Sequence, residues 1–242
     1  MLRQWEGPVA DSARTGWVWT LLPGRLVLFA AFQAVLAIVT GSWGAGAGLW
    51  PIAATLANLV TIGLLIGLIG SGGYRALFRV DRTRLGADLP VLAGVVLLGA
   101  PLAVLPNIWL ANGLFGSPDI PLNLLLPPQP LPLVLAALAF PLTIMFAELP
   151  FYFGYLMPRL ERQTGNVALA VLLPALFLAA QHITLPLIFD VRFIAWRGLM
   201  YLPFALYLGV VLRWRPRLMP YLAIIHGALD LSVVAMMFGR LT

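Results

Sequence analysis

The sequence predicts an all-α protein, a polytopic transmembrane helix bundle of about seven to eight spans. Its 242 residues are 61% hydrophobic and 10% charged, with a mean hydropathy of +0.95. A soluble domain carries about 25% charged residues, so this chain lacks the polar side chains that would cover a surface facing water. No hydrophilic region separates the apolar segments, and we therefore expect residues 1–242 to form a single integral membrane domain.

Seven apolar segments have the length of about 17–25 residues that a helix needs to cross a bilayer. They are residues 25–41, 50–70, 89–111, 131–151, 167–187, 196–213 and 219–238. Glycine-rich stretches, GSWGAGAG and GSGGYR, separate the first three. The proline-rich stretch SPDIPLNLLLPPQP is expected to be a loop or a membrane-surface segment, and residues 74–89 an interfacial amphipathic turn. The sequence also allows an eighth helix, either short or re-entrant.

The basic residues are all arginines, and their distribution predicts the orientation of the helices. With the N-terminus in the cytoplasm, seven spans leave only Arg192, Arg197 and Arg240 outside, and the other twelve arginines inside. Cytoplasmic connections carry an excess of arginine, so we expect a cytoplasmic N-terminus. The arginines therefore indicate topology, and no nucleic-acid partner is expected. A composition rich in alanine, leucine and arginine without lysine indicates a GC-rich bacterial genome, hence a bacterial cytoplasmic (inner) membrane.

Ionisable side chains inside the predicted spans are the candidate functional residues, because charge in lipid is costly. They are Glu148, His182, His226 and Asp230. His226 and Asp230 are four residues apart, so they share one face of a helix, and the aspartate could orient the imidazole. Together the four fit a hydrolytic site. In it Glu148 takes a proton from water, the histidines position the water or stabilise an oxyanion, and Asp230 supports a partner.

The same side chains fit two other interpretations. A divalent metal such as zinc could be bound by His182, His226 and Glu148, with water in the open position, or no cofactor is used. The chain has no cysteine, which excludes cysteine ligands and nucleophiles. Each residue also has a structural interpretation: Glu148 at a helix end near water, His182 bonded to a backbone carbonyl, and His226 with Asp230 joining two helices.

The order and spacing of these residues resemble the CPBP family of intramembrane proteases, also called the Abi or type II CAAX endopeptidase family. The family's first motif, EExxxRG followed by a line such as YLLPRLE, is similar to ELPFYFG and YLMPRLE at residues 148–161. The second, FxxxH, is similar to ALFLAAQH, with Leu178 at the spacing position of the Phe. The third, HxxxN or HxxxD, is similar to residues 226–230. The resemblance covers about residues 140–235.

The resemblance implies hydrolysis of a peptide bond in or near the bilayer. Glu148 is then implied as the group that activates water, with the two histidines as its partners and Asp230 in the position that supports the oxyanion. Two positions of the first motif differ from the family, because Leu149 replaces its second Glu and Phe153 replaces its Arg.

Three functions follow from these observations. The first is an intramembrane peptidase acting on a membrane-embedded peptide or a lipidated protein, with membrane lipids around it. The second is an inactive scaffold or assembly partner in a membrane complex, which the loss of the Glu/Arg pair favours. The third is a small proton-coupled transporter that uses Glu148 and the histidines as a proton relay.

The predicted helix lengths conflict with a shared site, because they place Glu148 and His182 at different depths in the membrane. If the fourth helix begins at residue 131, Glu148 lies near its cytoplasmic end, whereas His182 lies past the middle of the fifth. At 1.5 Å per residue the two differ in depth by roughly 18 Å. A common site requires the fourth helix to continue through residue 160, or the fifth to be tilted or broken, as Pro174 and Pro186 permit.

Overall fold

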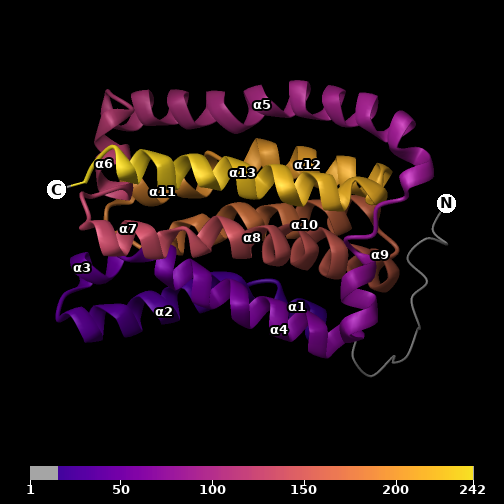
Figure 1. Cartoon of the computed structure of the whole chain (residues 1–242), viewed down its shortest axis with the longest axis horizontal. Helices are drawn as coiled ribbons and strands as arrows, with labels where there is room; N and C mark the ends of the chain where they lie inside the picture. The colour runs from indigo at the N-terminus through magenta and orange to yellow at the C-terminus, as the bar shows by residue number, and fades with distance from the viewer. Residues whose placement is uncertain (1–15, 242) are drawn as a thin grey trace.

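The computed structural model of the chain describes residues 16–241 and is shown in Figure 1. Residues 1–15 and 242, which include Arg3 and Arg14 of the arginine distribution, lie outside the described residues. Within residues 16–241 the regular structure is helical and no strand occurs, so the predicted all-α class is confirmed.

The helices follow one another with short connections. In chain order the α-helices are α1 (Trp17–Leu21), α2 (Gly24–Thr40), α3 (Trp43–Gly48), α4 (Trp50–Ala76), α5 (Leu85–Phe115), α6 (Asp119–Leu125), α7 (Leu131–Ala137), α8 (Ala139–Leu149), α9 (Met157–Thr164), α10 (Val167–Ala180), α11 (Val191–Leu199), α12 (Leu202–Trp214) and α13 (Met219–Phe238). Between them lie the 3-10 helices η3 (Arg82–Arg84), η5 (Gln181–Thr184) and η6 (Pro216–Leu218) and the π-helix η4 (Pro150–Leu156).

Six helical stretches within the described residues are long and apolar enough to cross a membrane, so the chain is an integral membrane protein. They are Trp50–Ala76, Arg82–Phe115, Leu131–Thr164, Val167–Thr184, Val191–Trp214 and Pro216–Phe238. They correspond to six of the seven predicted segments. The seventh, residues 25–41, corresponds to α2, which has 17 residues and is shorter than the other six. The prediction of seven to eight spans is therefore higher than these six, and reaches seven only with α2.

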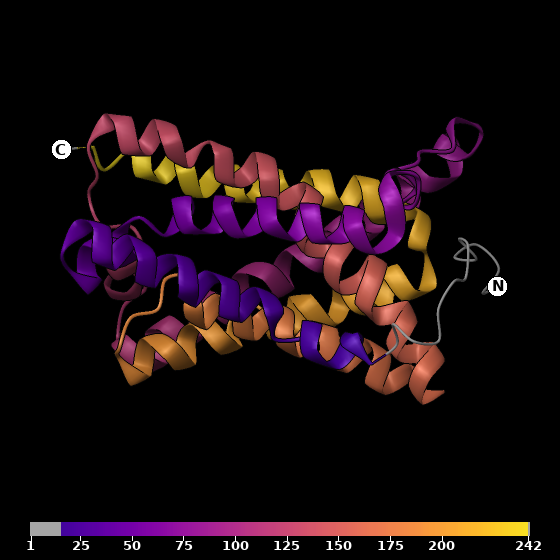
Figure 2. The ribbon, with the colours of Figure 1, turned by 90° about the horizontal axis from the view of Figure 1, so that it is seen from below.

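Consecutive spans run in alternating directions. The connections α4–α5, α9–α10 and α12–α13 lie at one end of the bundle, and α3, α6 and the end of α13 lie at the other (Figures 1 and 2). The first end carries most of the connecting arginines: Arg75, Arg79, Arg82, Arg84, Arg159, Arg162, Arg213, Arg215 and Arg217. Two arginines depart from the prediction. Arg25 and Arg197 are 0% and 3% exposed, so they lie inside the protein and not among the residues of a connection.

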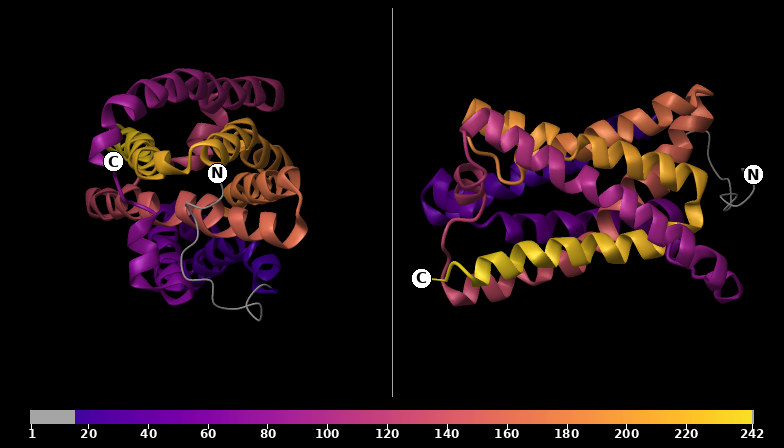
Figure 3. Two further views of the ribbon diagram at one scale, coloured as in Figure 1. Left: turned by 90° about the vertical axis from the view of Figure 1, so that its right-hand side faces the viewer. Right: turned by 90° about the horizontal axis from the view of Figure 1, so that it is seen from above.

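Two predicted connections are more helical than expected. α4 continues through GSGGYR to Ala76, with a kink at Gly70, whose positive φ of 72° favours a residue without a Cβ. The proline-rich segment 117–130 contains α6, so it is not a plain loop. Residues 77–84, with η3, form the turn between α4 and α5. α5 lies at the edge of the bundle and is the least buried of the six spans (Figure 3).

The fourth span continues from Leu131 to Thr164 through α7, α8, η4 and α9, which removes the conflict of depth. Pro150 has no N–H, so the carbonyl of Phe146 four residues earlier loses its helical partner. The hydroxyl of Tyr74 donates a 2.8 Å hydrogen bond to that carbonyl instead. The helix widens to a π-helix directly after Glu148, an irregularity that is frequent at functional sites. The fifth span also changes, from α10 to the 3-10 turn η5 at Gln181.

Helices α8 and α13 pack closely where α13 carries Gly227. A Cβ added at Gly227 would lie 2.9 Å from the carbonyl oxygen of Pro141 and 2.7 Å from Cε of Met145, so the two helices would have to separate. We predict that Gly227→Ala destabilises the protein by about 1–3 kcal/mol, the usual effect of overpacking. Thermal unfolding in detergent measures it. Gly113→Ala in α5, where a Cβ has no neighbour within 4 Å, is the control and should change little; equal effects of the two variants would contradict this packing.

Asp190 caps the N-terminus of α11, accepting hydrogen bonds from the backbone N–H groups of Phe193 (3.0 Å) and Arg192 (2.8 Å). The Phe193 bond, followed by the Arg192 side chain, holds the pKa of Asp190 below its ordinary value. The stabilisation is thus complete above the unfolded pKa of about 3.9 and disappears as the pH falls through the lower folded pKa.

We predict that Asp190→Ala lowers stability at neutral pH by about 0.5–2 kcal/mol, the usual value of an N-cap. Thermal unfolding as a function of pH should show the difference between variant and wild type shrinking below pH about 3.9. Asp119→Ala, at an exposed position in the first turn of α6, is the control. A difference that persists unchanged in acid would show that the carboxylate is not the capping group.

Candidate active site

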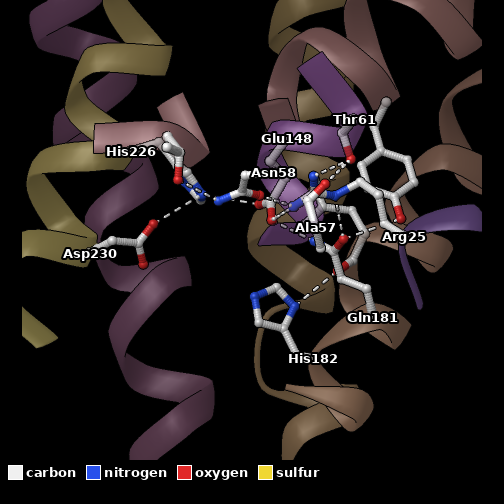
Figure 4. A network of polar contacts seen from close by, with 12 residues as sticks. Arg25, Ala57, Asn58, Thr61, Glu148, Gln181, His182, His226 and Asp230 are labelled. Atoms are coloured by element: carbon white, nitrogen blue, oxygen red, sulfur yellow. Dashed lines mark hydrogen bonds and ion pairs between the residues drawn. The ribbon is translucent and has the colours of Figure 1, made fainter. Parts of the chain in front are cut away.

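A layer of polar side chains crosses the bundle between two clusters of buried apolar residues. The first cluster includes Leu22, Leu65, Leu149, Leu178 and Leu222, and the second includes Phe29, Ala57, Ile144, Leu185 and Val234. Each of five helical segments passes from one cluster to the other. The residues between the clusters are Arg25, Asn58, Thr61, Glu148, Gln181, His182, His226 and Asp230 (Figure 4). Five segments distant in the sequence therefore bring their polar residues to one level.

Glu148 and His226 meet directly within this layer. Glu148 is fully buried, and its Oε1 lies 3.0 Å from Nε2 of His226. The same nitrogen lies 3.4 Å from Oδ2 of Asp230, one helical turn further along α13. The side chains of His226 and Asp230 are 14% and 21% exposed, so the layer can be reached from their side. The structure thus brings together three of the four predicted residues, and Figure 4 shows their line of contacts.

Several polar atoms of this group make no hydrogen bond among the described residues beyond the ion-pair contacts that they make with one another. They are Oε1 of Glu148, both ring nitrogens of His226 and Oδ2 of Asp230. Buried polar atoms are nearly always hydrogen-bonded, and exceptions are often found where a protein binds a polar group or performs chemistry. This side of the layer therefore has unused capacity to bind water or a polar part of a substrate.

The second oxygen of Glu148 has a different environment. Oε2 accepts a hydrogen bond of 2.5 Å from Nε2 of Gln181 and lies 3.5 Å from Nη2 of Arg25. Both partners are fully buried. An ionised carboxylate away from water needs such partners, because the lost hydration is otherwise not compensated.

Arg25 reaches this oxygen from α2 and is itself bonded on three sides. Nε donates to Oε1 of Gln181 at 2.9 Å, Nη1 to Oγ1 of Thr61 at 3.1 Å, and Nη2 to Oδ1 of Asn58 at 2.9 Å. The aromatic ring of Phe29 lies 4.9 Å from the guanidinium. The sequence analysis assigned Arg25 to the cytoplasmic arginines, which was wrong. The neutral polar residues Asn58, Thr61 and Gln181 inside apolar segments were the overlooked signal.

His182 lies in η5 at the edge of the layer. Its Nδ1 is 2.9 Å from the carbonyl oxygen of Leu178, and since a carbonyl only accepts, Nδ1 carries the hydrogen. The structural alternative, a backbone hydrogen bond, is therefore realised. Nε2 remains for other contacts, and the imidazole interacts electrostatically with Glu148 and His226 without touching them. Its ring packs at 4.5 Å from the ring of Tyr201.

Arg197 supports the segment that carries His182. Its Nε donates to the carbonyl oxygen of His182 at 3.1 Å, and its Nη2 donates to the carbonyl oxygen of Leu185. The sequence analysis counted Arg197 among the outside arginines, whereas the structure buries it behind the site. A guanidinium satisfies the two carbonyls at the end of η5, which the helix itself leaves unpaired.

The residues do not fit a metal centre as they are arranged. No group of three His, Asp or Glu side chains in residues 16–241 is placed to hold a metal ion. Glu148 has one oxygen beside the Arg25 guanidinium, which repels a cation, and Nδ1 of His182 is used by a carbonyl. The zinc alternative that joined Glu148, His182 and His226 therefore receives no support from this geometry.

Residues 129–232 match a family model described as Type II CAAX prenyl endopeptidase Rce1-like. This segment resembles that family, and we call it the Rce1-like segment. It contains Glu148, both histidines and Asp230, so the resemblance predicted from the motifs is confirmed over nearly the same residues. Comparison of the chain with curated proteins and with solved structures found no match. Arg25, Asn58 and Thr61 lie before the Rce1-like segment.

The two departures from the first motif lie outside the polar layer. Leu149 and Phe153 are 1% and 0% exposed and belong to the first apolar cluster. Phe153 packs against Gly209 of α12, where an added Cβ would lie 3.1 Å from its ring. In this chain these positions of the Rce1-like segment serve packing, and the charged partner of Glu148 comes from α2.

The role of Arg197 predicts a local effect on His182. Arg197→Met leaves the carbonyls of His182 and Leu185 unpaired, so we expect a loss of about 1–3 kcal/mol in stability. Carbon-13-labelled histidine gives two NMR signals because the chain has two histidines, and the His182 signal should move. Arg192→Met on the same helix, whose side chain is 59% exposed, is the control. A stable Arg197→Met protein with an unmoved His182 signal would contradict the assignment.

Proposed function

We propose that this protein is an intramembrane endopeptidase in which Glu148 activates water to hydrolyse a peptide bond in or near the bilayer. The observation that carries the proposal is the buried carboxylate of Glu148, whose Oε1 lies 3.0 Å from Nε2 of His226 on the partly exposed side of the layer. The match of residues 129–232 to a family of endopeptidases supports the same class of reaction.

The proposed reaction takes place on the side of the layer where Oε1 of Glu148 faces His226, while Arg25 and Gln181 hold the carboxylate from the other side. Glu148 Oε1 takes a proton from water while the water oxygen bonds to the carbonyl carbon of the peptide. The imidazole of His226 donates to the oxyanion that develops on the carbonyl oxygen, while Nε2 of His182, which carries no hydrogen when Nδ1 donates to Leu178, accepts from the attacking water and positions it. Glu148 then passes the proton to the amide nitrogen as the C–N bond breaks. Asp230 orients His226, as second partners of a catalytic histidine commonly do.

The proposed substrate is a membrane-embedded peptide or a lipidated protein C-terminus. The layer lies between two apolar clusters and opens on the side of α13, in a protein whose outer surface is apolar. The family is described as a CAAX prenyl endopeptidase, which supports a C-terminus with an attached lipid as one form of this substrate. We place the protein in a bacterial cytoplasmic membrane with its N-terminus and its arginine-rich end in the cytoplasm.

The central role of Glu148 is tested by an isosteric change. Glu148→Gln keeps the shape but cannot accept the proton, so cleavage of a quenched fluorescent peptide library should fall by at least about 100-fold. Glu161→Gln is the matched control, because Glu161 pairs with Arg213 at 2.6 Å at the end of the bundle. The measurement uses purified protein in nanodiscs. Cleavage by Glu148→Gln at the wild-type rate would remove Glu148 from the mechanism.

A non-catalytic scaffold is the second candidate, and the apolar packing of Leu149 and Phe153 favours it. In a scaffold the pair of Glu148 and Arg25 would serve only to hold helices together. Wild-type protein that cleaves no peptide but retains a membrane partner on purification, also as Glu148→Gln, would establish this role. Proton-coupled uptake by liposomes containing the protein would instead assign the layer to transport.

A further inference from the structure

The carboxylate of Glu148 is divided between two environments. Oε2 accepts from Gln181 and pairs with Arg25, whereas Oε1 pairs with Nε2 of His226 at 3.0 Å. A carboxylate can rotate about its last torsion with little restraint, because terminal torsions of this kind have broad energy wells. The contacts to Oε2 therefore decide which way Oε1 points.

The groups that hold Arg25 are themselves held. Asn58 donates from Nδ2 to Oγ1 of Thr143 at 3.1 Å, and the hydroxyl of Thr61 donates to the carbonyl of Ala57 at 2.7 Å. The hydroxyl of Tyr152 lies 3.3 Å from Oε1 of Gln181 and donates to it. Besides Glu148, the guanidinium thus contacts side chains of α4 and η5 whose other polar atoms are already bonded. Its position follows from several rigid elements, as precise functional sites require.

The Rce1-like segment by itself offers no cation to this oxygen. Phe153 occupies the position of the family's arginine and is buried among apolar residues. Within the described residues Arg25 forms the only arginine ion pair with Glu148, and α2 lies outside the matched segment.

We propose that Arg25 is the positioning residue of Glu148. Its guanidinium supplies the counter-charge and fixes Oε2, so that Oε1 stays turned toward His226 and ready to take a proton. This inference rests on the proposed function for its catalytic meaning, but the positioning itself is a property of the folded protein.

The geometry requires arginine and not merely a positive charge. A guanidinium has donors in a rigid planar fork and can bond Gln181, Thr61 and Asn58 while facing a carboxylate. A lysine ammonium supplies the charge from a single point and leaves part of these acceptors unpaired. Arg25→Lys should therefore retain only part of the wild-type function, and Arg25→Met should retain less.

The first measurement is peptide cleavage by Arg25→Met and Arg25→Lys in nanodiscs. A lost positioning group should lower kcat by about 10–100-fold with KM nearly unchanged, because Arg25 is fully buried behind the carboxylate. Arg25→Lys should lie between Arg25→Met and wild type. Arg213→Met, which removes the partner of Glu161 at the end of the bundle, is the matched control and should keep kcat.

The second measurement does not need turnover. In protein with carbon-13-labelled histidine, the His226 signal reports the position of Oε1, which lies 3.0 Å from its ring. At one fixed pH the signal of Arg25→Met should move toward its place in Glu148→Gln, and Arg213→Met should leave it unmoved. A purely structural role of Arg25 predicts lower thermal stability with the His226 signal unmoved in the folded fraction.

The outcomes separate the two proposals. Wild-type protein without peptidase activity would overturn the proposed function, while the His226 signal would still test the positioning. If Arg25→Met does not fold, Arg25→Lys decides, because it keeps the charge. An unchanged His226 signal together with wild-type kcat in Arg25→Lys would overturn the role of the fork, and the same result in a folded Arg25→Met would overturn the role of Arg25 altogether.

Discussion

Burial of the ion pair between Glu148 and Arg25 is the constraint that organises this bundle. Both side chains are fully buried, with Oε2 and Nη2 3.5 Å apart. Removing two charges from water costs several kcal/mol for each ion unless nearly every donor and acceptor is matched. The protein meets this requirement with neutral polar groups from α4 and η5 around the guanidinium. The same requirement fixes how α2, α4, α8 and η5 are placed relative to one another, since each must bring its polar residue to one level.

The local sequence around Glu148 also helps to place its carboxylate inside the bundle. Pro150 removes one helical hydrogen bond, the hydroxyl of Tyr74 replaces it, and the helix widens over Pro150–Leu156. The span nevertheless continues to Thr164, so Glu148 lies inside the bundle and not at a helix end. On the opposite side, Gly227 lets α13 approach α8 closely enough for His226 to reach the carboxylate. Pro150 thus shapes the helix next to Glu148, and Gly227 allows the close packing that brings His226 to it.

The site is built by two parts of the chain. The Rce1-like segment carries the carboxylate, both histidines and Asp230, and the preceding helices α2 and α4 carry the groups that hold the carboxylate. Oε1 pairs with His226 on the partly exposed side of the layer, whereas Oε2 is held by Gln181 and Arg25 inside the protein. This division explains how a chain that lacks the second Glu and the Arg of the family's first motif can still present an oriented glutamate.

The sequence alone determined the all-α membrane fold and six of the spans, and its motifs predicted the candidate residues within the Rce1-like segment. Hydropathy reports which stretches prefer lipid, and motif spacing reports chemistry along one chain segment. The tertiary structure alone decided the partners. The Nε–Oε1 bond of Arg25 and Gln181 joins residues 156 positions apart, and hydropathy carries no information about which helices become neighbours. For that reason Arg25 and Arg197 were assigned to the ends of helices, where an arginine reaches headgroups. Both are in fact buried and donate hydrogen bonds to acceptors in other helices.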